Sequence, residues 1–288
     1  MPELPEVEVV RRSLHSFIKG LKIKQITILN RKLRYEIKNN LEKEVKNQKV
    51  IFIKRRSKFI LIGFENEKTI LIHLGMTGKI FIYNQSSNKY SKTSFYYENK
   101  IDKKHNHLLI IFNKKIHLVY NDVRKFGFIK IVPLRGIKKN NHIKLLGPEP
   151  LNSNFNIKYL NSKVKNIKKN VKNLLMDQRL VSGLGNIYVN EILHLSAINP
   201  RKLSKNIKKH QIKKIIKNTK IILIRAINSG GSSIRDFQGT SGKQGNYQQK
   251  FLVYDREGQV CRKIGCGGKI KKIYISNRST FYCLKCQK

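Results

Sequence analysis

The chain has 288 residues, 40% of them hydrophobic, which is enough for two domains with apolar cores. Lysine and arginine number 61 against 17 aspartates and glutamates, giving a formal net charge of +44. This excess favours a polyanionic partner, nucleic acid first, although Lys and Asn are abundant throughout, as an AT-rich genome would also produce. Charge alone does not choose between DNA and RNA, or between an enzyme and a packaging protein. No apolar run approaches the roughly 18 residues of a membrane span, and MPELPEVE does not resemble a signal peptide. We therefore expect a cytoplasmic protein that does not enter a membrane.

The first region is predicted to be a helix followed by short strands. Residues 5–19 carry apolar side chains at helical spacing, including Val7, Val10 and Leu14, and Gly20 suits the end of the helix. Between residues 22 and 132 come β-rich runs such as KVIFIKR, KFILIGF, TILIHL, HLLIIF and IHLVY, separated by Asn, Lys and Gly. So many short strands predict an antiparallel two-layered sandwich or barrel.

The second region is predicted to be helical and to end in a small cysteine module. Residues 135–152 are rich in Pro, Gly and Asn and read as a linker, which places the first domain at 1–134. Helical patterns follow in a domain at 153–250, where residues 230–250 read as a loop. The last part, 251–288, contains all four cysteines. The expected fold class is therefore α+β and multidomain.

The cysteines are Cys261, Cys266, Cys283 and Cys286, with the spacing C-x4-C-x16-C-x2-C. Clustering of this kind in a cytoplasmic chain indicates a metal site rather than scattered disulfides. The spacing predicts one structural zinc ion bound by four thiolates, with a basic hairpin between the two pairs. Four free thiols are the alternative.

The N-terminus has unusual chemistry. Removal of Met1 before proline would expose Pro2 as a secondary amine, and an α-amino group has a pKa of roughly 8. Such an amine can attack a sugar C1′ and form an iminium, with Glu3 beside it as general acid or base. Glu6, in the first turn of the helix, would hold the site in place. The alternative is that Pro and Glu only begin a helix.

The segment MDQRLVSGLGNIYVNEIL predicts a helix ending near Gln178, a glycine-containing turn, and a second helix beginning at Asn186. The start of a helix is a ready site for phosphate. The same asparagine would also be an ordinary N-cap, and the two interpretations are compatible.

Seven motifs occur together and in order: MPELPEVE, RRSKFILI, LIHLGMTG, NDVRKFG, LLGPEPL, LMDQRLVSGLGNIYVNEIL and the cysteine module. Over its whole length the chain therefore resembles bacterial formamidopyrimidine-DNA glycosylase, a repair enzyme that removes oxidised purines. Leu4 favours this branch over the related endonuclease VIII group, which usually has glycine there. The resemblance implies a β-sandwich with its leading helix, a helix–two-turn–helix domain with a loop that caps the lesion, and a zinc ribbon.

The resemblance also implies a role for each matching residue. Pro2 matches the nucleophile and Glu3 the proton donor, while Lys58 matches a lysine that serves β-elimination and contacts phosphate. Arg278 matches the hairpin arginine that grips phosphates and is linked to δ-elimination. The implied DNA contacts are Met76, His105, Arg124, Phe126, Lys172 and Asn186. Among these, Met76, Arg124 and Phe126 match the three residues that fill the gap left by a flipped base; core packing is the alternative for Met76 and Phe126.

The expected partner is double-stranded DNA containing oxidised purines or abasic sites, bound by a monomer. The chain departs from the family pattern at Val123, Lys125 and Asn173, and in the four residues between Cys261 and Cys266. Two rival functions remain open at this point. One is an endonuclease VIII-like glycosylase acting on oxidised pyrimidines, and the other is a zinc protein that binds DNA without catalysis.

Overall fold

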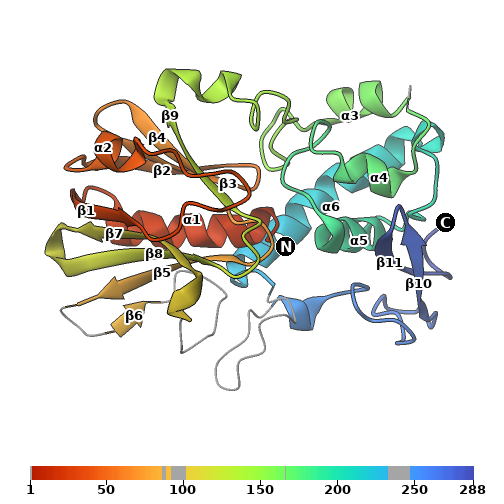
Figure 1. The fold of residues 1–288 in the computed structure, drawn as a ribbon. Helices are drawn as coiled ribbons and strands as arrows, with labels where there is room; N and C mark the ends of the chain where they lie inside the picture. Colours follow the sequence, from red (N-terminus) through yellow and green to blue (C-terminus); the bar gives the residue numbers. More distant parts are fainter. Residues whose placement is uncertain (1, 86–88, 92–101, 166, 233–246) are drawn as a thin grey trace. The chain divides into compact units, whose positions relative to one another are not determined.

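The computed structural model describes residues 2–85, 89–91, 102–165, 167–232 and 247–288 (Figure 1). It divides into two units, each described below by itself. The first consists of Met1–Lys144 with Ser229–Asn246, and the second of Leu145–Asn228 with Tyr247–Lys288. The four domain ranges expected from the sequence remain a prediction. The expected lesion-capping loop lies mostly outside the described residues, as does Met1.

The first unit contains two antiparallel sheets (Figure 1). One has the strand order β1-β7-β8-β5-β6 and the other β2-β3-β4-β9. The strands are β1 (Ile23–Ile28), β2 (Val50–Arg56), β3 (Phe59–Phe64), β4 (Lys68–His73), β5 (Gly78–Asn84), β6 (Lys89–Ser91), β7 (Asn106–Phe112), β8 (Ile116–Asp122) and β9 (Phe128–Pro133). The predicted antiparallel sandwich is therefore confirmed, with β6 as a strand that the sequence pattern did not indicate.

One apolar core joins both sheets to the leading helix, α1 (Leu4–Ile18). The buried face of α1 consists of the side chains expected from helical spacing, among them Val7, Val10 and Leu14. Gly20 follows the helix with a φ of +81°, a conformation that glycine adopts without strain. A short helix that was not predicted, α2 (Leu41–Val45), adds Leu41 to the same core. This packing fixes the start of α1, where the candidate nucleophile lies.

The second unit contains helices α3 (Ile157–Val164), α4 (Val171–Met176), α5 (Asn186–Leu195) and α6 (Lys209–Asn228). Short 3-10 turns lie at Ser204–Asn206 and Gln248–Lys250. The turn between α4 and α5 is organised by Gln178, which donates to the carbonyls of Met176 and Leu184 and accepts from the Gly183 N–H. Gly183 has a φ of +89°. The tight reversal predicted from the two glycines is therefore present.

The hairpin predicted between the cysteine pairs is also present, as β10 (Ile270–Ile275) and β11 (Arg278–Cys283). Ser276 and Asn277 form its two-residue turn, with φ values of 48° and 58°. Positive φ at both positions matches the twist of a tight hairpin, and asparagine adopts this conformation more readily than most residues. Arg278 begins β11 directly after this turn and is exposed. Among the described residues, no helix has both the length and the apolar character needed to cross a membrane.

Candidate active site

The start of α1 forms a buried polar site. Pro2 is buried, and Glu3 and Glu6 have exposed fractions of 3% and 1%. Glu3 is the N-cap of α1, and its backbone N–H donates to Glu6 Oε2 at 2.8 Å. The other oxygen, Glu6 Oε1, accepts from Ser232 twice, from the N–H at 2.8 Å and from Oγ at 3.0 Å. Glu6 thus fixes Glu3, and with it the backbone next to Pro2.

Lys58 lies in the tight turn between β2 and β3 and is buried, with 7% of its surface exposed. The preceding residue, Ser57, has a φ of 55°, and its carbonyl accepts a hydrogen bond from Arg55. Arg55 Nε also donates to Glu8 Oε2 on α1 at 3.0 Å. This ion pair is largely shielded from water, since both side chains are mostly buried. It ties the turn that carries Lys58 to the helix that carries Pro2 and Glu3.

Glu8 is held in its charged form. Burial raises its pKa, but hydrogen bonds and charges from Arg11, Arg55 and Arg12 outweigh burial and lower the pKa below its ordinary value. A carboxylate with three guanidinium neighbours is a stable anchor near neutral pH.

His73 ends β4 close to the charge of Lys58. Burial first, then the charges of Lys58 and Arg34, lower the pKa of His73 to about 4. The ring is therefore neutral near pH 7, and its Nδ1 accepts from the Gly75 N–H at 3.0 Å. A neutral, fixed ring next to a cationic lysine is a polar group that the sequence reading did not single out.

Two loops that carry the predicted gap-filling residues lie against each other. A Cβ on Gly75 would come within 2.4 Å of the backbone of Phe126 and of Gly127. Only glycine allows this approach, and Gly75 also has a φ of +61°. Next to it Met76 is half-buried, while Phe126 has 42% of its surface exposed. These values place Phe126 at the surface rather than in the core.

Arg124 completes this group, because its guanidinium carbon lies 4.6 Å from the centre of the Phe126 ring. A cation over an aromatic face is attracted by the ring quadrupole, so the two exposed side chains support each other. The structure thus places Met76, Arg124 and Phe126 on neighbouring loops.

The two loops share a buried anchor, Asp122, which has no exposed surface. Its Oδ1 accepts from Thr77 Oγ1, and its Oδ2 accepts from the Gly127 N–H at 2.8 Å. Thr77 Oγ1 in turn accepts from the Arg124 N–H at 3.0 Å. The carboxylate therefore holds the loop of Met76 and the loop of Phe126 in one arrangement.

His105 lies apart from these loops in the 3-10 turn Lys103–His105. Its Nε2 is 3.7 Å from Asp102 Oδ2, and 23% of the side chain is exposed. Hydrogen bonds from Lys104 lower the pKa of Asp102, so this carboxylate faces two basic neighbours. His105 thus has a carboxylate neighbour and partial access to solvent.

In the second unit, buried polar side chains hold the start of β11. Lys172 has no exposed surface, and its ammonium donates to the Ser279 carbonyl at 3.1 Å and to Thr280 Oγ1 at 2.6 Å. Asn186 Nδ2 donates to the same Ser279 carbonyl at 3.0 Å. In this conformation Lys172 is turned toward the hairpin instead of the surface. It fixes the strand that begins with Arg278.

Asn186 is the first residue of α5, and Gly185 is the N-cap. The N-cap interpretation of Asn186 was therefore wrong, because its amide is used by the hairpin instead of its own helix. Its Oδ1 is buried and has no hydrogen-bond partner among the described residues. Asn173 adds a third link, since its Nδ2 donates to Ser276 Oγ at 2.8 Å. This bond gives a local use to an asparagine that departs from the family pattern.

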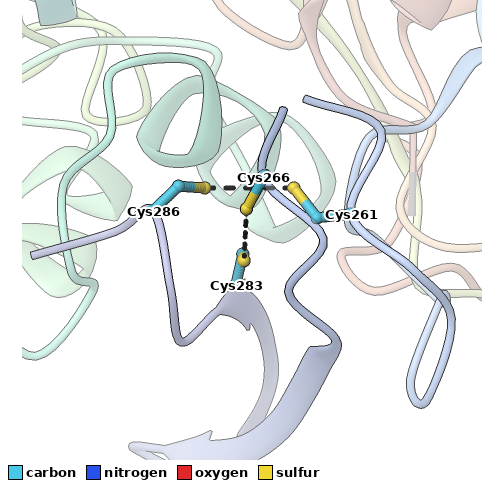
Figure 2. A group of neighbouring side chains, drawn as sticks. All are labelled: Cys261, Cys266, Cys283 and Cys286. Atoms are coloured by element: carbon cyan, nitrogen blue, oxygen red, sulfur yellow. Dashed lines mark hydrogen bonds between the residues drawn. The ribbon is translucent and has the colours of Figure 1, made fainter. Parts of the chain in front are cut away.

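The four cysteine sulfurs converge at the base of the hairpin (Figure 2). All lie within 4.8 Å of one another, with 3.6 Å between Cys266 and Cys283 and 3.9 Å between Cys261 and Cys286. A hydrogen bond from the Gly268 N–H is the main cause that lowers the pKa of Cys266 to about 7, whereas burial raises that of Cys261. This cluster can hold a metal ion.

Several supporting residues were missed by sequence reasoning: Ser232, His73, Asp122, Arg55 and Asn173. Ser232, Asp122, Arg55 and Asn173 each make a contact far along the chain, such as the 226 residues between Glu6 and Ser232, whereas His73 bonds the nearby Gly75 and owes its lowered pKa to burial and to Lys58. A single sequence carries no signal for contacts of this kind. Only Asp122 had a local hint, since an aspartate at the end of an apolar strand is expected to have a specific partner.

Comparison with known families gives two matches on this chain. The formamidopyrimidine-DNA glycosylase N-terminal domain matches residues 1–129, and the H2TH domain of the same protein matches residues 146–238. Together the matches span well over half of the chain. The chain belongs to the formamidopyrimidine-DNA glycosylase family.

Relatives from other bacteria align with this chain over its full length. A formamidopyrimidine-DNA glycosylase of Rickettsia bellii is 38% identical, with 100% of both chains covered. One from Bradyrhizobium sp. is also 38% identical at the same coverage. Among solved structures, a Lactococcus lactis variant bound to DNA containing Fapy-dG has a TM-score of 0.86, 33% identity and 100% coverage of both chains. The same bacterium's enzyme bound to abasic DNA has a TM-score of 0.85, 33% identity and 99% coverage of each chain.

Proposed function

We propose that this chain is a base excision repair glycosylase that removes oxidised purines, 8-oxoguanine and formamidopyrimidines, from duplex DNA and then cleaves the strand as an AP lyase. The observation that carries the proposal is the buried start of α1. There Glu6 holds the Glu3 backbone next to Pro2, and Glu3 itself is almost fully buried. Glu3 and Glu6 form a reciprocal capping box at this helix start, which holds both carboxylates in fixed positions beside Pro2.

The chemistry follows from a secondary amine at Pro2. Its nitrogen attacks C1′ of the damaged nucleotide, and the bond from C1′ to the base breaks, with the electron pair leaving on the base. The proton that the amine loses neutralises the leaving base. The nitrogen lone pair then expels the ring oxygen O4′ from C1′, and Glu3 donates the proton that O4′ takes up. The resulting cationic iminium withdraws electrons and makes the C2′ proton acidic. Removal of that proton breaks the C3′–O bond, and a second elimination releases the 5′ phosphate.

Lys58 is proposed to serve the elimination steps. It is mostly buried in a turn anchored to α1 through the pair of Arg55 with Glu8. In such a position its ammonium would contact the phosphate beside the reacting sugar. The neutral ring of His73 nearby adds a polar partner without adding positive charge.

The DNA contacts are proposed in two groups. Met76, Arg124 and Phe126 would fill the gap that the flipped base leaves, since the exposed Phe126 ring and its stacked guanidinium form an apolar and cationic wedge. Arg278 would grip phosphates from the tip of the hairpin, and His105 would add a contact from its solvent-accessible turn. Asn186 would contribute through the N–H groups at the start of α5, which suit a phosphate, and by holding the hairpin through its bond to Ser279.

Lys172 is proposed to act through the hairpin. Its ammonium has no exposed surface and already binds Ser279 and Thr280. It therefore supports DNA binding by positioning Arg278, without contacting a phosphate itself.

The four-cysteine cluster is proposed to hold one structural zinc ion. A tetrahedral site with Zn–S bonds of about 2.3 Å separates its sulfurs by roughly 3.8 Å. The separations of 3.6 Å between Cys266 and Cys283 and 3.9 Å between Cys261 and Cys286 are close to this value. Four sulfurs leave no position open, so the ion would fix the hairpin and take no part in the chemistry. Cys283→Ser should release the metal and abolish tight DNA binding while the first unit stays folded.

The partner is duplex DNA, bound by a monomer, and we place the protein in the bacterial cytoplasm with the nucleoid. The net charge of +44 suits a polyanion and gives a binding constant that falls steeply with salt.

Turnover on matched duplexes tests the proposal. We expect faster excision from an 8-oxoguanine duplex than from a thymine glycol duplex, and loss of excision in Glu3→Gln. The reverse preference would favour the endonuclease VIII-like alternative. One Lactococcus lactis relative has been crystallised with DNA containing an oxidised pyrimidine, so both substrates must be compared at several concentrations. No excision from either duplex would favour a DNA-binding protein without catalysis.

A further inference from the structure

A histidine lies against the cysteine cluster without belonging to it. His194 is on α5, one residue before the end of that helix, and only 4% of its surface is exposed. Its Nε2 is 3.2 Å from Cys261 Sγ and 3.9 Å from Cys286 Sγ. The four clustered sulfurs are enough to fill a tetrahedral metal site, so His194 would be a neighbour of the ligands and not a ligand.

The two ring nitrogens have different surroundings. Nε2 faces the sulfurs, whereas Nδ1 is buried and has no hydrogen-bond partner among the described residues. If the proton were on Nδ1, a buried N–H would lack an acceptor, and the Nε2 lone pair would face the lone pairs of sulfur. With the proton on Nε2, the sulfur accepts a hydrogen bond. The group left without a partner is then the Nδ1 lone pair, a weaker hydrogen-bonding group than an N–H.

We propose that His194 is a positioning residue of the metal site, whose Nε2–H donates to the Cys261 thiolate and stabilises the charge of the four-cysteine set. This inference rests on the proposed metal site. A donor to a metal-bound thiolate delocalises part of its negative charge and fixes the side chain in the ligating rotamer. Partners of this kind outside the ligand set typically change metal affinity by about 10- to 100-fold.

The contact of His194 with Cys261 also links α5 to the cysteine module. α5 also carries Asn186 and Asn190, which hold β11 through the Ser279 carbonyl and the Phe281 N–H. A bond from His194 to Cys261 ties the same helix to the first cysteine pair. The helix that carries a proposed phosphate contact is thereby joined to both ends of the zinc module.

Packing is the alternative role, because the neighbouring residues Val189, Ile192 and Leu193 on α5 are buried hydrophobics. Two substitutions separate the roles. His194→Phe keeps an aromatic ring of similar size and removes the N–H. His194→Gln places an amide N–H near the position of Nε2 and removes the ring.

The first measurement is zinc release from the full-length metal-loaded protein to a chromophoric chelator. We expect His194→Phe to bind zinc roughly 10-fold or more weakly than the wild type, and His194→Gln to recover most of the loss. Equal zinc affinity in the wild type and His194→Phe would overturn the inference, as would a loss in His194→Gln as large as that in His194→Phe.

The second measurement needs no variant and stays informative if His194→Phe does not fold. The wild type is loaded with 113Cd and labelled with 15N-histidine, and NMR is used to look for coupling between 113Cd and the Nε2 proton. We expect coupling and the Nε2–H tautomer; the Nδ1–H tautomer would overturn the inference. Metal analysis of the wild type distinguishes a failure of the proposed zinc site from a failure of the role of His194. Absence of bound zinc refutes the metal site and this inference together, whereas bound zinc with the Nδ1–H tautomer refutes the role of His194 alone.

Discussion

Glu6 Oε1 accepts two hydrogen bonds from Ser232, a residue 226 positions away in sequence. The other oxygen of the same carboxylate holds the N–H of Glu3. Gly231 allows this contact, since a Cβ there would lie 3.1 Å from Glu6 Oε1 and its φ is +81°. A single buried carboxylate therefore couples the candidate catalytic terminus to the described start of the segment that follows α6.

Glu6→Gln should weaken this link, because an amide has one acceptor oxygen for three donors. Leaving a buried donor without its partner costs about 1–3 kcal/mol. We expect lower stability in urea and slower formation of the covalent intermediate. Ser232→Ala removes only the Oγ donor and should show a smaller loss of about 0.5–1.5 kcal/mol. If Glu6→Gln matches the wild type in urea stability and in the rate of intermediate formation, the hydrogen bonds of Glu6 contribute to neither.

The salt dependence of DNA binding distinguishes Lys172 from Arg278. Each neutralised phosphate contributes about −0.9 to the slope of log K against log salt. Arg278→Ala should therefore weaken binding and make the slope shallower by about that amount. Lys172→Met should weaken binding through the hairpin but leave the slope unchanged. A shallower slope in Lys172→Met would show that Lys172 itself contacts a phosphate.

Binding to damaged and undamaged duplexes tests the wedge. Met76→Ala should cost more affinity on the damaged duplex, because the side chain acts only when a base has left the stack. Val123→Ala is the matched control, since this residue is 48% exposed on the neighbouring loop and belongs to no wedge. Equal losses on both duplexes in Met76→Ala would favour a packing role.

Stability should depend on pH through His73. Its folded pKa of about 4 lies below the ordinary value of 6.5, so between these values the unfolded chain binds more protons. The free energy of unfolding should therefore fall as pH decreases from 6.5 toward 4. His73→Asn keeps an acceptor for the Gly75 N–H and cannot titrate. The free energy of unfolding of this variant should therefore decrease less over the same pH range. Parallel urea denaturation curves at pH 5 and 7 provide the test, and identical pH dependence would contradict the assignment.

Most of the fold followed from sequence periodicity. The strand runs, the helix at the start and the hairpin between the cysteines are local patterns, so β2, β3 and α1 fall within about two residues of expectation. α2 was missed because five residues, Leu41–Val45, are too few for a clear helical period. β6 was missed because its partner β5, not its own composition, makes it a strand.

The site was less predictable than the fold. Spacing alone indicated the cysteine cluster, and the order of motifs indicated Pro2, Glu3 and Lys58. The sequence did not indicate that Asp122 holds two loops or that Lys172 is buried, since both facts depend on tertiary packing. Buried polar groups of this kind are recognised by their partners, and partners far along the chain are visible only in the folded structure.

The central claim is that the Pro2 nitrogen forms the covalent intermediate. Borohydride should reduce the iminium and leave the protein irreversibly attached to an 8-oxoguanine duplex. Mass spectrometry of the digested adduct should then place the sugar remnant on Pro2, in a chain from which Met1 has been removed. A variant with one extra N-terminal residue should not form the adduct. An adduct on Lys58, or trapping at the wild-type rate in the blocked variant, would contradict the account.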